Sequence, residues 1–314
     1  MSGRPIMPQP PVLRPGRQTA LVLTCAGWLT GLLSGCIVIP PPVASHFNRG
    51  VEFQDQGKNS DAIEEYQLAL RERPDDTFAK YNLAVVFQDM AQDAEAEKLY
   101  GEILAVTEDT HSRINRAAIY HARGEKDRAL EELRTAAEKN PYNPNPLSVL
   151  GDYLEQENKL KEAEDHYQQA VAIDGKHAAS WHRLGRVQVK RGEARPGLLS
   201  LARAVELDPE DPAYLVSLAE AHEREHRVLE AINLYEQASV LDPDRVDLYV
   251  KLGDLYSQKE MFSEAVNRYW SALSIKGDDP HVHRRLRDIF ELLARQESVT
   301  LKELEKQSSF AQNP

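Results

Sequence analysis

The chain has 314 residues, a formal net charge of −12 at pH 7 and 41% hydrophobic residues. This length and apolar content are enough for a buried core. The acidic balance argues against nucleic acid as a partner. Cys25 and Cys36, the only cysteines, both lie near the N-terminus. The rest of the chain therefore has no structural disulfide.

The first 35 residues have the features of an export signal. Arg4, Arg14 and Arg17 precede an uncharged apolar run, Thr19 to Leu33. A positive head, a short apolar core and small residues after it predict a secretory signal over residues 1–35. Translation could start at Met1 or at Met7.

The apolar run ends in Leu33-Ser34-Gly35-Cys36. This order resembles the bacterial lipoprotein box, in which an aliphatic residue and two small residues precede a cysteine. The resemblance implies a diacylglycerol on Cys36, cleavage before it and acylation, for example with palmitate, of the new amine. Two or more acyl chains are enough for stable anchoring. Ile37 replaces the aspartate of the inner-membrane retention signal, which suggests a lipid anchor in the outer membrane, facing the periplasm.

An uncleaved transmembrane helix over Ala20 to Ile39 is the alternative, because about 20 apolar residues span a bilayer. Both interpretations place the remaining chain outside the cytoplasm. Residues 36–42 then form a short, proline-rich tether, stiff at Pro40 to Pro42. We therefore expect the part that follows to lie close to the membrane.

From Val43 onward, a pattern of small and large residues recurs with a step of 34 residues. Alanine or glycine occupies positions 8 and 20 of every repeat, and alanine occupies position 27 of six repeats. Position 24 is tyrosine or leucine: Tyr66, Tyr100, Leu133, Tyr167, Leu201, Tyr235 and Tyr269. Small residues let two antiparallel helices touch, and glycine at position 15 of three units permits the turn between them. One helix pair cannot bury its own apolar face, so the pairs must stack.

This pattern resembles the tetratricopeptide repeat family. The resemblance implies an all-α fold, a right-handed α-solenoid of seven helix pairs. The expected domains are seven repeats over 43–279 (43–76, 77–109, 110–143, 144–177, 178–211, 212–245 and 246–279), capping helices over 280–307 and a loose tail over 308–314. The segment from Asn140 to Pro146 is the junction richest in turn residues. Gly197, after Pro196, is expected to loosen the second helix of the fifth repeat.

By resemblance to the family, the first helices line a concave groove that binds a protein or peptide. Position 6 is asparagine in three consecutive repeats, as Asn48, Asn82 and Asn115. An amide has both a donor and an acceptor, so a ladder of asparagines could hold a peptide backbone. The alternative is that asparagine is simply common at this position.

The fifth repeat differs, because Arg183, Arg186 and Lys190 form a basic stripe on its first helix. Such a stripe invites an acidic segment or a C-terminal carboxylate. The alternative is a solvated basic face that Glu220 and Glu223 of the next repeat balance.

One motif suggests chemistry, since His222-Glu223-Arg224-Glu225-His226 fits the H-E-x-x-H pattern of zinc hydrolases. The repeat places His222 at a packing position and His226 in the turn, so the two rings need not share a face. No third ligand is indicated. We therefore expect no catalytic residue, no metal and no cofactor.

The sequence as a whole predicts a membrane-anchored scaffold that binds proteins and has no enzymatic activity. Its architecture resembles that of the outer-membrane tetratricopeptide lipoproteins that help to assemble cell-envelope machines, such as the pilotins of type IV pili. A scaffold lipoprotein of an exopolysaccharide export system is the alternative. A zinc hydrolase is the remote one.

Overall fold

The computed structural model describes the backbone of residues 45–311 and the side chains of residues 45–298. The predicted signal, Cys36 and the tether lie outside these residues. The described backbone forms fifteen α-helices and no strand, which confirms the predicted all-α fold of stacked helix pairs. The helices are α1 (His46–Asp55), α2 (Asn59–Glu72), α3 (Thr77–Asp89), α4 (Asp93–Leu104), α5 (Thr110–Ala122), α6 (Lys126–Lys139), α7 (Asn145–Gln156), α8 (Leu160–Ile173), α9 (Ala178–Lys190), α10 (Ala194–Leu207), α11 (Pro212–Arg224), α12 (Val228–Leu241), α13 (Val246–Gln258), α14 (Phe262–Ile275) and α15 (Pro280–Ala311).

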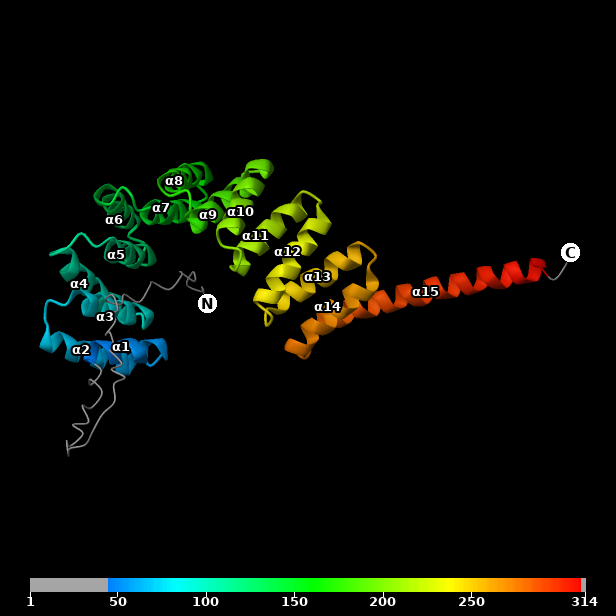
Figure 1. Cartoon of the computed structure of the whole chain (residues 1–314), viewed down its shortest axis with the longest axis horizontal. Coiled ribbons are helices and arrows are strands. Elements are labelled where there is room, and N and C mark those ends of the chain that lie inside the picture. The colour runs from blue at the N-terminus through cyan, green and yellow to red at the C-terminus, as the bar shows by residue number, and fades with distance from the viewer. Residues whose placement is uncertain (1–44, 312–314) are drawn as a thin grey trace, which may run out of the picture. The chain divides into compact units, whose positions relative to one another are not determined.

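The chain divides into two compact units, Met1–Tyr142 and Asn143–Pro314. Helices α1–α6 belong to the first unit and α7–α15 to the second (Figure 1). The division falls inside the turn-rich segment from Asn140 to Pro146. Within each unit, every helix packs against the next one along the chain.

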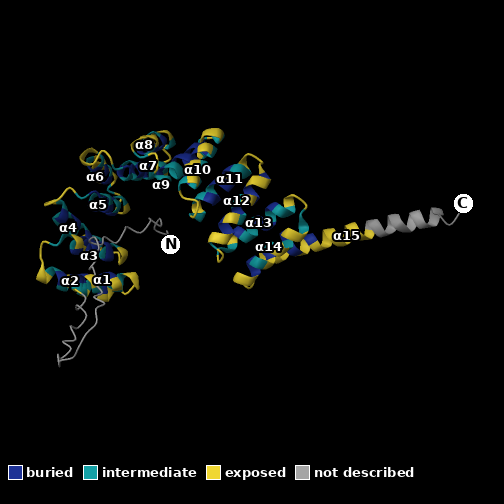
Figure 2. Cartoon of the chain, viewed as in Figure 1, coloured by how far each residue is buried: buried dark blue, intermediate teal, exposed yellow. Residues whose placement is uncertain are grey.

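In each helix pair, a glycine or alanine at position 8 of the first helix faces the large residue at position 24 of the second helix. A Cβ on Gly151 would lie 2.4 Å from the ring of Tyr167, and one on Gly253 would lie 2.5 Å from the ring of Tyr269. Real Cβ atoms do not approach other atoms so closely, so these two rings, as they are placed, leave room only for glycine. The repeats of Tyr100 and Tyr235 have alanine at position 8 instead. All five of the tyrosines at position 24 are buried, and the buried residues lie between the helices (Figure 2).

The turn between the helices of a pair takes the left-handed conformation in all seven repeats. Gly57, Gly124 and Gly192 have φ of 71°, 81° and 82°. The other four repeats have a non-glycine residue at this place with φ between 58° and 59°: Ala91, Asn158, His226 and Glu260. This conformation disfavours residues with a Cβ, so glycine fits it best.

The second helix of the fifth repeat, α10, is as long as the equivalent helices of the other repeats in the second unit. The expectation that Pro196 and Gly197 would loosen it is wrong. Pro196 lies in the first turn, where no intrahelical partner for its missing N–H is needed. Gly197 is buried, and a Cβ there would meet Val189 at 2.5 Å. Its small size therefore allows α9 and α10 to approach each other.

Residues 280–311 form one 32-residue helix, α15, rather than a pair of capping helices, and this helix includes residues 308–311 of the expected tail. The chain has no glycine or proline between Pro280 and Pro314 that could end the helix earlier. Val282, Leu286 and Ile289 are buried against α14. The start of α15 thus covers the apolar face of α14 at the end of the second unit.

Candidate protein-binding site on the first helices of the second unit

The three asparagines of the predicted ladder have different surroundings. Asn48 is exposed, whereas Asn82 is fully buried. Asn115 is also buried, and its Nδ2 donates to the hydroxyls of Tyr81 and Tyr100 at 3.2 Å and 3.1 Å. The amides of Asn82 and Asn115 are thus not presented to solvent, and the asparagines do not form one exposed ladder. Their role in holding a peptide stays a prediction.

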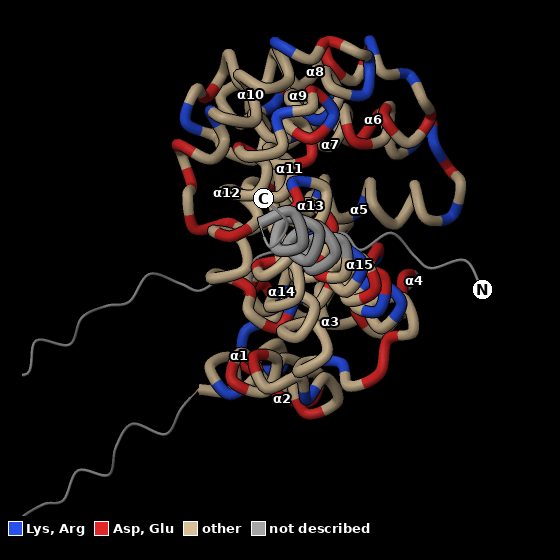
Figure 3. Tube along the Cα trace, turned by 90° about the vertical axis from the view of Figure 1, so that its right-hand side faces the viewer, with Lys and Arg blue, Asp and Glu red and all other residues tan. Residues whose placement is uncertain are grey.

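The basic stripe of α9 is paired with acids of the preceding repeat. Arg183 Nε lies 2.9 Å from Asp152 Oδ1. Arg186 Nη2 lies 3.5 Å from Glu155 Oε1, and Lys190 pairs with the same oxygen. The expectation that Glu220 and Glu223 balance this stripe is wrong, because the long cationic side chains reach back to α7. Acidic and basic positions lie close together on α7 and α9 (Figure 3).

Asp152 is the centre of an arrangement that we call a carboxylate bridge. In a carboxylate bridge, an acid on the first helix of one repeat binds two partners. One is the tyrosine at position 24 of the same repeat, and the other is a cation at position 6 of the helix that begins the next repeat or the cap. Tyr167 donates to Asp152 Oδ1 at 2.7 Å while Arg183 binds the same carboxylate. Burial raises the pKa of Asp152, and the charge of Arg183 opposes this rise. The bridge therefore joins two neighbouring repeats through a half-buried acid.

Two more carboxylate bridges follow in the second unit. Tyr235 donates to Glu223 Oε2 at 3.0 Å, and Lys251 Nζ lies 3.0 Å from Glu223 Oε1. In the last repeat, Tyr269 donates to Asp254 Oδ1 at 2.7 Å. Arg285 of α15 binds the same oxygen at 3.1 Å.

The bridge is missing between the fifth and sixth repeats. Leu201 stands at position 24 in place of tyrosine, Arg186 at position 9 in place of an acid, and Ser217 at position 6 in place of a cation. All three members are replaced together. At position 12, where the sixth repeat has the bridging Glu223, the fifth repeat has Val189, which offers no carboxylate either.

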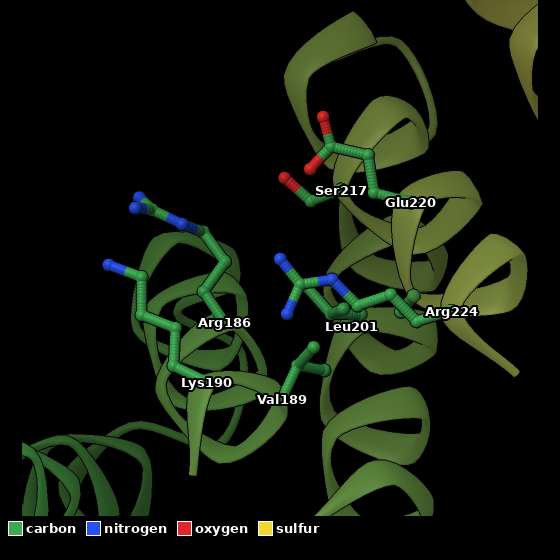
Figure 4. A pocket seen from close by; sticks show the side chains of 8 residues that line it. Arg186, Val189, Lys190, Leu201, Ser217, Glu220 and Arg224 are labelled. Carbon is green, nitrogen blue, oxygen red and sulfur yellow. The ribbon is translucent and has the colours of Figure 1, made fainter. Parts of the chain in front are cut away.

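A pocket of about 140 Å³ lies where this bridge is missing. Val189 and Leu201 form its apolar part, and Arg186, Lys190, Ser217, Glu220 and Arg224 bring polar groups (Figure 4). Arg224 reaches from α11 toward α9 (Figure 4). Leu201 is shorter than the tyrosine of the neighbouring repeats, which leaves this space open. The pocket thus combines three cationic side chains with a single acid.

His182 lies next to the pocket and is held neutral. Its Nε2 lies 2.7 Å from Ser217 Oγ, and its ring packs on Tyr214 with 4.7 Å between the ring centroids. Burial, with the charges of Arg186 and Arg183, lowers the pKa of His182 to about 3. At neutral pH the ring therefore fixes the Ser217 hydroxyl without adding charge.

The H-E-x-x-H motif does not form a metal site. Helix α11 ends at Arg224, and His226 lies in the turn with φ of 58°, as the repeat pattern predicted. Glu223, the base of the hypothetical hydrolase, is engaged by Tyr235 and Lys251. Among the residues that the structure describes, no three His, Cys, Asp or Glu side chains form a group that could hold a metal ion.

Sequence reasoning found the tyrosines at position 24 and the cations of α9, but it missed the acids Asp152 and Asp254 that join them. The signal was present, because Tyr167, Asp152 and Arg183 recur as Tyr269, Asp254 and Arg285 at the same repeat positions. A search for recurring polar residues, besides small ones, would have found them.

A family model for the tetratricopeptide repeat matches residues 47–100, 122–178 and 182–246. These segments make up more than half of the chain, which therefore belongs to the tetratricopeptide repeat family. Proteins of this architecture are interaction scaffolds, and the chain has the stacked helix pairs that this role requires.

Three curated relatives show how the similarity is distributed. Human protein O-mannosyl-transferase TMTC1 is 29% identical over 58% of this chain and 21% of its own length. The peroxisomal targeting signal receptor of Komagataella phaffii is 34% identical over 26% of this chain and 15% of its own. The photosystem I assembly protein Ycf3 of Synechococcus is 31% identical over 30% of this chain and 57% of its own. The chain thus spans about a fifth of the human relative and only part of the others.

Solved structures agree with the fold. The Cut9–Hcn1 hetero-tetramer of the APC/C superposes with a TM-score of 0.57 at 15% identity, over 78% of this chain and 48% of that one. A tetratricopeptide repeat protein from Parabacteroides merdae superposes with a TM-score of 0.52 at 19% identity, over 78% of this chain and 97% of that one. At these identities the likeness concerns the fold alone. Within residues 45–311, no helix is both long and apolar enough to cross a membrane.

Proposed function

We propose that the chain is a lipid-anchored scaffold that binds a protein partner along the first helices of its second unit and holds it at a cell-envelope membrane. The observation that carries the binding role is the pocket between α9 and α11, where cations of two repeats meet without a carboxylate bridge. Ion-paired surfaces elsewhere on these helices are already neutralised by their own neighbours. A partner that supplies anionic groups therefore gains the most favourable electrostatic interaction at this pocket.

The membrane anchor of the proposal rests on the sequence around Cys36. A positive segment, an uncharged apolar run and Leu33-Ser34-Gly35-Cys36 support attachment of lipid to this cysteine. The outer membrane, facing the periplasm, is the proposed location. Assembly of an envelope machine of the pilus or secretin type is the proposed process, and export of an exopolysaccharide is the alternative.

Site-specific crosslinking tests the binding role. A photoreactive amino acid in place of Glu220, which is exposed and lines the pocket, is expected to capture a partner protein in cells. The matched control replaces Glu230, an exposed glutamate on the second helix α12. The proposal requires capture from position 220 and not from position 230. Equal capture from both positions, or capture from 230 alone, would contradict it.

Metabolic labelling with palmitate tests the anchor separately. The protein with Cys36 is expected to take up label and to sediment with membranes, whereas Cys36→Ala should do neither. Label that persists after Cys36→Ala would refute lipid attachment at this residue. Membrane sedimentation without any label would favour the uncleaved transmembrane helix.

A further inference from the structure

The structure points to the chemistry of the partner group. We infer that the pocket between α9 and α11 receives a carboxylate of the bound protein, which takes the place of the acid that the fifth repeat lacks. This inference rests on the proposed binding role and deepens it. The carboxylate bridges on either side, at Asp152, Glu223 and Asp254, show what these helices do with a carboxylate when the chain provides one.

The cationic side chains around the pocket outnumber the acids that form ion pairs with them. Arg186 and Lys190 share one oxygen of Glu155. The guanidinium of Arg224 makes no ion pair or hydrogen bond with the residues whose side chains are described, and Arg224 is exposed. A carboxylate between Arg224 and Arg186 would receive charge-assisted hydrogen bonds from two helices. It would thereby link the fifth and sixth repeats, as Asp152 links the fourth and fifth.

Glu220 is the internal competitor for this position. It is the only acid among the residues that line the pocket, and it lies four residues before Arg224 on α11. This spacing permits a weak ion pair along the helix. In the structure, however, the Glu220 side chain makes no ion pair with Arg224, and its carboxylate points away from the guanidinium of Arg224 (Figure 4). A partner's carboxylate can therefore reach Arg224 without displacing an established ion pair.

The size and the apolar part of the pocket fit an acidic side chain or the end of a chain. Its volume of 140 Å³ is well above the roughly 10–15 Å³ of a cavity that just holds one water molecule. Val189 and Leu201 can cover the methylene groups that carry the carboxylate, while the ring of His182 stays neutral and holds the hydroxyl of Ser217. The carboxylate can come from an Asp or Glu side chain or from a C-terminus, and the test must distinguish the two sources.

Fluorescence anisotropy with short glycine-serine peptides provides this test. One peptide contains several glutamates and has blocked ends, a second has glutamine in place of each glutamate, and a third has no acidic side chain but a free C-terminus. We expect the glutamate peptide to bind the full chain and the glutamine peptide not to bind. Binding of the third peptide would assign the pocket to a C-terminal carboxylate. Equal binding of the glutamate and glutamine peptides, or of none of the three, overturns the inference.

Three variants locate the binding. Arg224→Gln is expected to weaken binding about tenfold, the loss typical of one charge-assisted hydrogen bond. Glu220→Gln should strengthen it, because the variant removes a negative charge that lines the pocket and repels the carboxylate of the peptide. Arg203→Gln removes the same charge from α10, where Arg203 pairs with Glu206 on the surface, and should leave binding unchanged. Circular dichroism verifies that each variant is folded.

The inference fails if Arg224→Gln and Arg203→Gln have the same effect on binding. Its failure is distinguishable from failure of the proposed function. Crosslinking from position 220 that persists in the Arg224→Gln variant, together with absent peptide binding, would keep the scaffold and discard the carboxylate. Absence of crosslinking would remove the scaffold role itself.

Discussion

The hydroxyl of Tyr167 lies 2.7 Å from Oδ1 of Asp152, an acid that also binds Arg183 of the next repeat. Tyr167→Phe removes this donor and leaves the half-buried carboxylate with one partner fewer. We expect a loss of about 1–2 kcal/mol in the free energy of unfolding, measured with urea. Tyr142→Phe is the control, because Tyr142 is 88% exposed. A Tyr167→Phe variant as stable as this control would show that the bridge does not stabilise the repeats.

The close contact between the small and large positions of a repeat predicts a second effect. Gly253→Ala would bring a Cβ within 2.5 Å of the ring of Tyr269, so the ring or the helix must move. The expected cost is about 1–3 kcal/mol, as for other overpacked cores. A Cβ on Gly277 meets no other atom within 4 Å, and its φ is not left-handed, so Gly277→Ala is the matched control. Thermal denaturation compares the two, and equal midpoints would refute the packing argument.

The left-handed turns predict opposite effects of opposite substitutions in the first unit. Ala91 has φ of 59°, so Ala91→Gly should relieve strain and stabilise the protein by about 0.5–1 kcal/mol. Gly124, at the same repeat position, has φ of 81°, so Gly124→Ala should destabilise it by a similar amount. Urea denaturation of both variants measures whether the free energy of unfolding rises or falls. Destabilisation by Ala91→Gly would contradict the strain argument.

His182 predicts a specific dependence of stability on pH. The folded state lowers the pKa of His182 from 6.5 to about 3, chiefly by burial and further through Arg186 and Arg183. Between these values the unfolded chain binds a proton that the folded chain does not, so stability falls as pH decreases below 6.5. Above pH 6.5 the contribution is complete.

The measurement compares the wild type with His182→Asn from pH 7 down to about 5, where most carboxylates remain charged. We expect the wild type to lose stability over this range faster than His182→Asn does. Parallel curves for the two proteins would show that His182 titrates alike in the folded and unfolded states.

The fold could be predicted because it depends on contacts within one repeat. A small residue at position 8, such as Gly151, and a large one at position 24, such as Tyr167, mark a helix pair wherever they recur. The left-handed turn at position 15 was recognisable at Gly57, Gly124 and Gly192. The same left-handed turn contains His226, which therefore lies outside the helix that carries His222.

The site was harder to predict, because its contacts join different repeats. The positions of Arg183 and Arg186 were recognised, but their partners on α7 depend on how far each side chain reaches back to the preceding pair. Asn115 was placed in a groove because of its position, whereas it is buried and donates to two tyrosine hydroxyls. The length of α15 was missed because no glycine or proline follows Pro280 before Pro314 to mark where the helix stops.

The most direct test of the account rebuilds the missing carboxylate bridge inside the chain. Arg186→Asp together with Ser217→Arg places an acid and a cation at the positions that Asp152 and Arg183 occupy one repeat earlier. We predict that this double variant remains folded and loses its affinity for the glutamate peptide, because its own carboxylate now engages the cations. Binding of that peptide with the affinity of the wild type would contradict the account.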